Sequence, residues 1–204
     1  TMDGMSTNTA GTSNFIAGTN AGNSIESGGN YNTVVGDEAG TAITTGDANT
    51  FYGYSAGVAT TTSSDNTAIG GAALATNILA SSNTAVGKNA LYAHNVGSAA
   101  STYNTAVGHH AGIAVTTGIQ NTLIGGLAGD ALTDSDKNVA VGYSALGTEV
   151  LGQFNVAIGR SALQAQSNGS AANVYNTAVG YNAGTAITTG VQNTLIGGTS
   201  GDAL

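Results

Sequence analysis

The sequence contains no cysteine, no proline and no tryptophan, and only 3 of its 204 residues are Lys or Arg. The absence of cysteine excludes disulfide bonds and thiolate metal sites. The net charge of −8 argues against a nucleic-acid partner, because binding to phosphates needs a cationic surface. The chain has no run of apolar residues long enough to span a bilayer, so we expect no membrane insertion.

Charged residues make up only 7% of the chain, whereas about a quarter is usual for a globular protein. Hydrophobic residues make up 41%, which is too high for a disordered chain. The acidic residues are scattered, and the histidines are His94, His109 and His110. No nucleophile stands in a recognisable pattern with a base. We therefore expect an ordered protein that is not an enzyme and needs no cofactor.

A repeated unit accounts for most of the sequence, and we number its positions from its first residue, an asparagine. Position five is always glycine, and position eight is alanine in every unit but the last. The opening asparagines are Asn14, Asn32, Asn49, Asn66, Asn83, Asn104, Asn121, Asn138, Asn155, Asn176 and Asn193. The glycines at position five are Gly18, Gly36, Gly53, Gly70, Gly87, Gly108, Gly125, Gly142, Gly159, Gly180 and Gly197. We interpret both sets as scaffold.

The units are grouped in fours. They begin 17 residues apart, except after the first unit (18) and after the last unit of each complete group (21). Position nine reads Gly, Gly, Leu, Leu through a group, which gives superrepeats at 32–103 and 104–175 and a partial one at 176–204. We expect residues 14–204 to form a single solenoid of eleven repeats and residues 1–13 a degenerate or partial N-terminal coil.

Each unit is too short to bury a hydrophobic face alone, so neighbouring units must stack. Position two is mostly Thr or Val and position four mostly Val or Ile, a pattern that predicts a short strand ended by the glycine. Stretches such as 41–46 and 113–118 predict a second strand. The sequence therefore predicts an all-β parallel solenoid, with position four and the alanine of position eight inside and the asparagines in an amide ladder.

Position three is apolar in all eleven units. If position four fills the interior, position three forms an exposed apolar stripe along the solenoid, and such a stripe favours association with another chain. A bulged or flattened coil that takes both positions inside is the alternative.

Four stretches carry a resemblance to a known family: NTAVGKNAL (83–91), NVAVGYSAL (138–146), NVAIGRSAL (155–163) and NTAVGYNAG (176–184). They resemble the head repeats of YadA-like trimeric autotransporter adhesins and the related N-T-A-I-G-x-x-A-L repeats of phage tail-fibre-like and bacterial surface proteins. The units here are longer than those of the adhesin heads. The resemblance implies a left-handed β-roll, a side-by-side homotrimer and attachment to a surface.

Few residues are candidates for a site. His109 and His110 are weak candidates for a metal site, because adjacent strand residues point to opposite faces. Asp134 and Asp136 resemble part of a calcium loop, but a surface turn fits their surroundings better. The longer segments 93–103 and 165–175, and the shorter 27–31, end on a tyrosine. Tyr31, Tyr103 and Tyr175 are therefore candidates for contact with another chain or a ligand; alternatively, each covers the coil edge beneath it.

The sequence thus predicts a structural protein, the shaft or head of an adhesive or receptor-binding fibre at a cell surface, on a virion or elsewhere outside the cell. Its partners would be copies of itself and a cell-surface receptor or glycan, but not nucleic acid. An extracellular filament that assembles end to end is an alternative, because 176–204 stops within a superrepeat. Ice binding through threonine arrays such as Thr116–Thr117 and Thr188–Thr189 is a third, weaker one.

Overall fold

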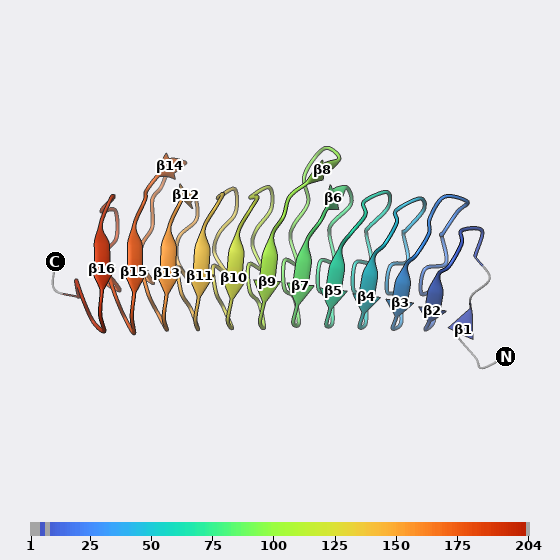
Figure 1. The fold of residues 1–204 in the computed structure, drawn as a ribbon, viewed down its shortest axis with the longest axis horizontal. Helices are drawn as coiled ribbons and strands as arrows, with labels where there is room; N and C mark the ends of the chain where they lie inside the picture. Colours follow the sequence, from blue (N-terminus) through green and yellow to red (C-terminus); the bar gives the residue numbers. More distant parts are fainter. Residues whose placement is uncertain (1–4, 7–8, 203–204) are drawn as a thin grey trace. The chain divides into compact units, whose positions relative to one another are not determined.

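The computed structural model describes residues 5–6 and 9–202 of the chain. The chain consists of two compact units, unit 1 (Thr1–Tyr103) and unit 2 (Asn104–Leu204), and their boundary coincides with the end of the first superrepeat. Within each unit the main strands stack in sequence order, one main strand per coil (Figure 1). The described residues include no helix.

All strands are two or three residues long. Unit 1 contains β1 (Met5–Ser6), β2 (Phe15–Ala17), β3 (Thr33–Val35), β4 (Thr50–Tyr52), β5 (Thr67–Ile69), β6 (Ala80–Ser81), β7 (Thr84–Val86) and β8 (Ala100–Ser101). Unit 2 contains β9 (Thr105–Val107), β10 (Thr122–Ile124), β11 (Val139–Val141), β12 (Gly152–Gln153), β13 (Val156–Ile158), β14 (Ala172–Asn173), β15 (Thr177–Val179) and β16 (Thr194–Ile196).

The main strands pair in parallel, and each position of the repeat lies beside the same position of the next coil. In unit 1 the register runs from Thr33 to Thr50, Thr67 and Thr84. The eleven main strands confirm the predicted parallel β-solenoid. β1 pairs antiparallel with β2; the other residues of 1–13, expected to form a partial coil, are described only from residue 9 onward.

The predicted orientation of the strands was wrong. Position three points inward, with Val34, Phe51 and Ala68 fully buried, whereas position four points outward, with Ile69 at 39% exposure. The cause is the two-residue alternation of a strand. Because the asparagine at position one is buried, position three must be buried too, and positions two and four face out.

The buried asparagines are hydrogen-bonded from coil to coil. The Oδ1 atom of Asn32 accepts a bond from the backbone N–H of Asn49 (2.9 Å) and another from its Nδ2 (3.1 Å). Asn49 Nδ2 also donates to the carbonyl oxygen of Ser63, across the interior of its own coil (2.9 Å). Asn49 therefore fixes its coil to the preceding one and also closes its own coil, and Asn32 and Asn66 do the same.

The glycines of position five stack backbone on backbone. Gly70 has a φ of +129°, and a Cβ atom on it would lie 2.7 Å from the carbonyl carbon and oxygen of Gly87 in the next coil. This conformation disfavours any side chain, and the contact leaves no space for one. The neighbouring Gly71 has no such constraint, because a Cβ there would meet no atom within 4 Å.

In two successive coils of unit 1, the residue at position nine matches the interior volume left by position three. In the coil of Phe51 this position is Gly57, whose Cβ would lie 2.5 Å from the phenyl ring. In the next coil position three shrinks to Ala68, and Leu74 at position nine fills the space, fully buried. Leu74 has a φ of +54°, a conformation that costs a non-glycine residue about 1 kcal/mol, and its burial offsets this cost.

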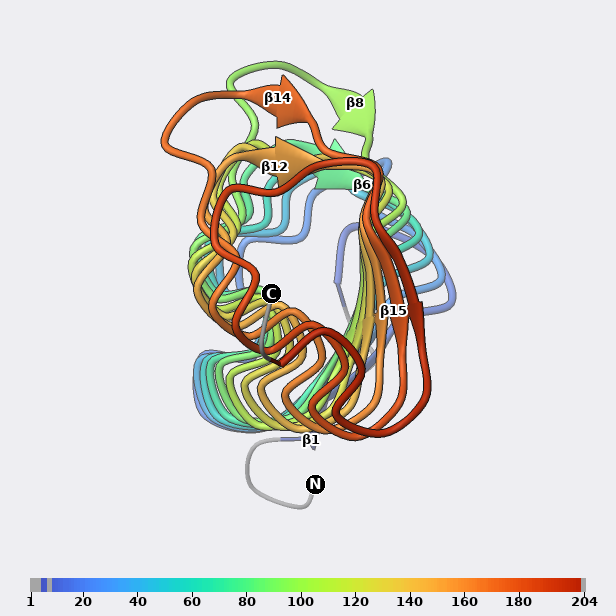
Figure 2. The same ribbon diagram turned by 90° about the vertical axis from the view of Figure 1, so that its left-hand side faces the viewer.

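The predicted second strand in every coil was also wrong. Residues 41–46 and 113–118 form turns and bends, although Ile43 and Val115 point inward as the pattern required. Among the described residues from 9 onward, a second strand appears only beside the longer segments, where β8 pairs with β6 and β14 with β12. In the end-on view of Figure 2, the segment that carries β14 projects beyond β12.

We predict that Gly70→Ala lowers the free energy of unfolding by about 3 kcal/mol, because it forces a side chain into a glycine-only conformation against the Gly87 backbone. Gly71→Ala is the matched control and should change stability by less than about 1 kcal/mol. Denaturant unfolding of both variants measures the difference. Equal stability of the two variants would contradict the stacking argument.

Candidate functional site

The outward face of the main strands carries rows of uncharged side chains at positions two and four. In unit 2, Ile124 and Ile158 at position four are each 38% exposed, and position two includes Val139 and Val156, which are half-buried. The matching residues of unit 1 are Thr67 and Thr84, so this face is more apolar in unit 2. We call it the strand face. It is uncharged, exposes aliphatic side chains and is uncovered, as is typical of a protein interface.

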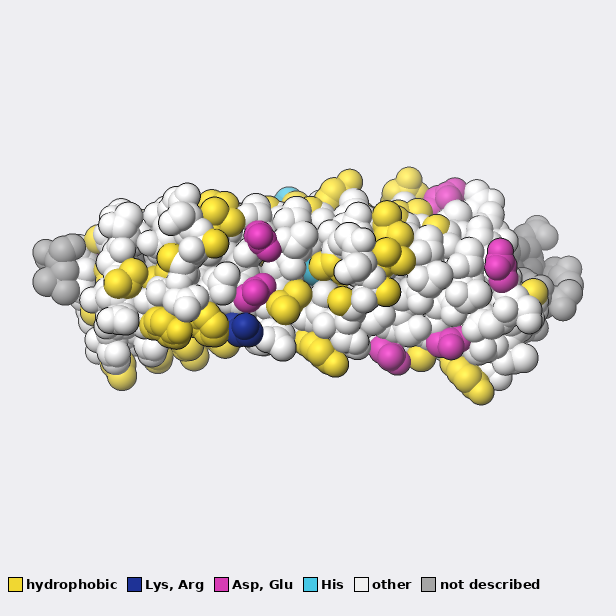
Figure 3. All heavy atoms as spheres, turned by 90° about the horizontal axis from the view of Figure 1, so that it is seen from above, with side chains coloured by type: hydrophobic (Ala, Val, Ile, Leu, Met, Phe, Trp, Pro, Cys, Tyr) yellow, Lys and Arg dark blue, Asp and Glu magenta, His cyan; other side chains and the backbone are white. Residues whose placement is uncertain are grey.

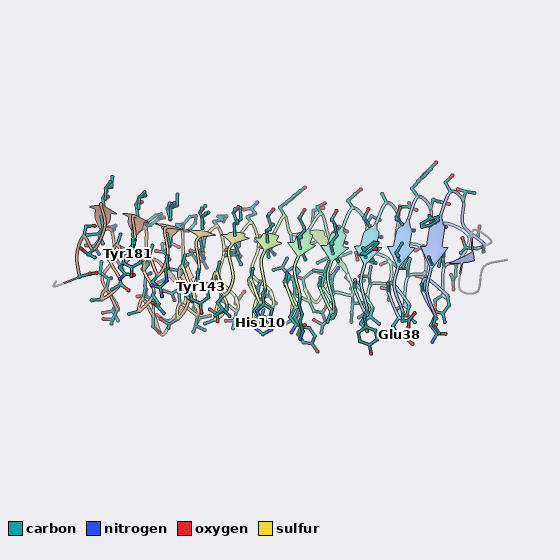
Figure 4. The ribbon with its side chains drawn as sticks, turned by 90° about the horizontal axis from the view of Figure 1, so that it is seen from below. Glu38, His110, Tyr143 and Tyr181 are labelled. Carbon is teal, nitrogen blue, oxygen red and sulfur yellow. The ribbon has the colours of Figure 1, made fainter. Side chains whose placement is uncertain are left out.

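One edge of the strand face is formed by position six, in the turn that follows the glycine. In unit 2, Tyr143, Arg160 and Tyr181 occupy this position on three successive coils. The Arg160 guanidinium carbon lies 5.8 Å from the centroid of the Tyr143 ring and 5.6 Å from that of Tyr181. Both tyrosines are more than half exposed. Figure 4 labels Tyr143 and Tyr181 at position six, and His110 of unit 2 and Glu38 of unit 1 at the next position, seven, of the same turn.

The opposite edge is formed by the residue just before each asparagine. In unit 2 the Lys137 ammonium lies 5.1 Å from the Phe154 ring centroid, and the Phe154 ring stacks on that of Tyr175 at 5.1 Å. Tyr175 is 48% exposed, and Tyr31 and Tyr103 of unit 1 are 67% and 59% exposed. The three tyrosines thus present ring surface to solvent, and Tyr175 also covers part of the preceding coil.

We expected His109 and His110 to point to opposite faces of a strand, and this expectation was wrong. They lie in the turn after β9, where their rings stack with centroids 3.8 Å apart. Burial raises the pKa of the nearby Asp130 carboxyl, and a backbone hydrogen bond and then the charge of His110 oppose this shift. Among the described residues, no group of three or more His, Asp or Glu side chains could hold a metal ion.

Asp134 and Asp136, the other metal candidates, form hydrogen bonds to the preceding coil. Asp136 Oδ1 accepts a bond from the backbone N–H of Ile119 (2.8 Å), and Asp134 Oδ1 accepts one from the Thr117 hydroxyl (2.5 Å). The same position accepts bonds in unit 1, where Asp47 takes the place of Asp136. These contacts give both aspartates a structural role, which is to connect their coil to the preceding one.

A buried carboxylate anchors the segment 165–175, which sequence reasoning missed. Glu149 is fully buried at position twelve, where the first two coils of its group carry the apolar Val115 and Leu132. Its Oε1 atom accepts hydrogen bonds from four backbone N–H groups. These donors are Val150 (2.9 Å), Leu151 (3.1 Å), Gly152 (2.8 Å) and Asn168 (3.2 Å).

The second oxygen of Glu149 binds the following coil. Its Oε2 accepts bonds from Gln166 Nε2 (3.0 Å) and Asn168 Nδ2 (3.1 Å), and Gln166 Oε1 in turn accepts one from Asn176 Nδ2 (2.9 Å). Donors therefore surround the carboxylate, as a buried charge requires. The network fixes the start of the segment that ends at Tyr175.

Unit 1 builds the equivalent segment, 93–103, on different side chains. Asn77 replaces Glu149, and its Oδ1 accepts a bond from the backbone N–H of Ala80 (2.9 Å). His94 replaces Gln166 and is fully buried, with its Nε2 3.0 Å from the Thr102 hydroxyl. A comparison of position twelve between successive coils could have predicted this polar interior from the sequence, because polar residues recur there in the third and fourth coils of each group.

No known family model, curated protein or solved structure matches the chain. The likeness to adhesin heads and phage fibres therefore depends on the repeat motifs alone. Within the described part of the chain, no helix is long and apolar enough to cross a membrane. Most of the surface visible in Figure 3 is formed by uncharged polar side chains and backbone.

We predict that Glu149→Ala lowers the free energy of unfolding by about 3 kcal/mol or more, because buried N–H groups lose their acceptor. The control Glu26→Ala removes an exposed carboxylate and should cost less than about 0.5 kcal/mol. Denaturant unfolding gives the energies, and hydrogen exchange at the Asn168 amide should accelerate in Glu149→Ala only. Unchanged exchange at Asn168 would show that Glu149 does not anchor the segment.

Proposed function

We propose that this protein is a structural, non-catalytic component of an adhesive or receptor-binding fibre that acts outside the cell, at a bacterial surface or on a phage particle. The observation that carries the proposal is the uncovered strand face, with its rows of Val, Ile and Thr at positions two and four. Side chains such as Ile124 and Ile158 contribute nothing to the interior of the coil. Exposed apolar rows of this kind are typical of protein interfaces.

The face favours copies of the same chain as its partner. Its rows repeat at the strand spacing of about 4.8 Å, so an identical surface offers rows with the same period. Positions two and four carry no charged residue, so contact through this face places no like charges directly against each other, although the chain has a net charge of −8. Together with the resemblance of the repeats to trimeric adhesins, these features support lateral association into a homotrimer.

Sedimentation equilibrium of the full chain tests this association, and we expect three times the monomer mass. Ile158→Lys should dissociate the assembly, because it places a charge in the apolar row. The matched control is Ile78→Lys, since Ile78 is equally exposed (39% against 38%) but lies away from the strand face. A monomeric wild type would overturn the proposal, and long polymers would favour the end-to-end filament instead.

A specific observation also favours ice binding as a second candidate function. The threonines of position two, from Thr33 to Thr84, stand in register and face outward. By contrast, the Thr116 and Thr117 hydroxyls donate to Thr133 O (3.3 Å) and Asp134 Oδ1 (2.5 Å), so these threonines form no free array.

If position two binds ice, the protein will lower the freezing point of water without lowering the melting point, and Thr50→Lys will abolish this gap. An osmometer that follows single ice crystals measures both temperatures. Thr117→Lys is the control and should leave the gap unchanged. Equal freezing and melting temperatures of the wild type would remove ice binding from consideration.

A further inference from the structure

The position-six row of unit 2 consists of His109, Gly126, Tyr143, Arg160, Tyr181 and Gly198. At its centre the Arg160 guanidinium lies between two tyrosine rings, and its Nη1 donates to Tyr181 Oη (3.4 Å). A guanidinium has five N–H donors, so most of its capacity is uncommitted. The cation is thus held in place by aromatic contacts and can still bind an anion.

The glycines beside the tyrosines leave ring surface uncovered. A Cβ atom on Gly126 would lie 3.6 Å from Tyr143 Cδ2, so this glycine leaves open a space that a side chain would fill. Beyond it stands the exposed ring of His109, two coils from Tyr143. Two coil spacings are about 10 Å, which leaves room for one ring between His109 and Tyr143. We call this space the Gly126 slot.

The scaffold does not require these side chains. In unit 1 the row contains Asp37, Tyr54, Gly71 and Lys88, and the coils close through the same glycine stack. Position six therefore accepts acidic, basic, aromatic and glycine residues alike. Only in unit 2 does it bring an arginine between two tyrosines and open a slot between two aromatic rings.

We propose that the position-six row of unit 2 binds an acidic glycan, and this inference rests on the adhesive function proposed above. The apolar face of one sugar ring packs on Tyr143 in the Gly126 slot. A carboxylate or sulfate on a following sugar accepts paired hydrogen bonds from Arg160, the geometry for which guanidinium is suited. A chain of sugars suits a row that runs from coil to coil, because both repeat along one direction.

Calorimetric titration of the full chain with defined oligosaccharides tests the proposal. The probes are oligogalacturonate, which carries carboxylates, heparin oligosaccharides, which carry sulfates, and neutral cello-oligosaccharides. We expect at least one acidic probe to bind at least tenfold more tightly than the neutral one, and more weakly as salt increases. The acidic probe that binds more tightly identifies the anionic group. Equal binding of the neutral probe, or no binding of any probe, would overturn the proposal.

Two pairs of variants locate the site. Gly126→Thr fills the slot without backbone strain, because Gly126 has no positive φ, and Gly71→Thr is the equivalent change in unit 1. Arg160→Ala removes the cation, and Lys88→Ala is its control at position six of unit 1. We expect at least tenfold weaker binding for the two unit 2 variants and less than a twofold change for the controls. Unchanged binding by Gly126→Thr would place the glycan elsewhere.

The outcome is separable from that of the fibre proposal. None of these four substitutions lies at position two or four, so the mass in solution should equal that of the wild type for each variant. A trimer that binds no acidic glycan overturns only the glycan inference. A monomer that binds the glycan through Gly126 and Arg160 overturns only the fibre.

Discussion

The asparagine ladder is the interaction on which the rest of the structure depends. Within a group of coils, each Oδ1 atom accepts both the backbone N–H and the side-chain amide of the asparagine one coil later, as Asn32 does from Asn49. At the end of the second group, Asn155 Oδ1 still accepts the backbone N–H of Asn176, and the Asn176 amide donates to Gln166 Oε1. Because these groups are buried, leaving one unpaired would cost about 1–3 kcal/mol. This cost fixes the register of every coil, and it also decides which face of each strand is inside. The stacked glycines and the small interior follow from that choice.

The fold class could be predicted from the sequence because a 17-residue period without helical spacing has few structural solutions. The orientation of the strands was predicted wrongly, because the more hydrophobic Ile69 was expected inside and the smaller Ala68 outside. The narrow interior instead holds Ala68 and leaves Ile69 exposed. The asparagine two residues before Ala68 indicated the correct orientation, because residues two apart in a strand point to the same face. A buried amide was in this case a better guide to the interior than an aliphatic side chain.

The candidate site was less predictable than the fold. Position six looked merely variable, because its residues share no property along the sequence. The contacts of Arg160 with Tyr143 and Tyr181 depend on the stacking of coils whose position-six residues are 17 and 21 positions apart. Once the coils are stacked, inward positions determine stability and outward positions are free to differ. The two units accordingly share a scaffold but not a surface chemistry.

The buried network around Glu149 has a consequence for how the chain finds its structure. Nearly identical repeats can stack out of order, since one coil offers much the same ladder and glycine stack as another. The Oε1 atom of Glu149 has donors within its own coil, but its Oε2 atom gains donors only when Gln166 and Asn168 lie in the coil above it. A stack shifted by one coil would bury the carboxylate against apolar side chains, at a cost that excludes it. The polar interior thus specifies the order in which similar coils stack. It selects one arrangement of the chain from others whose apolar packing would be similar.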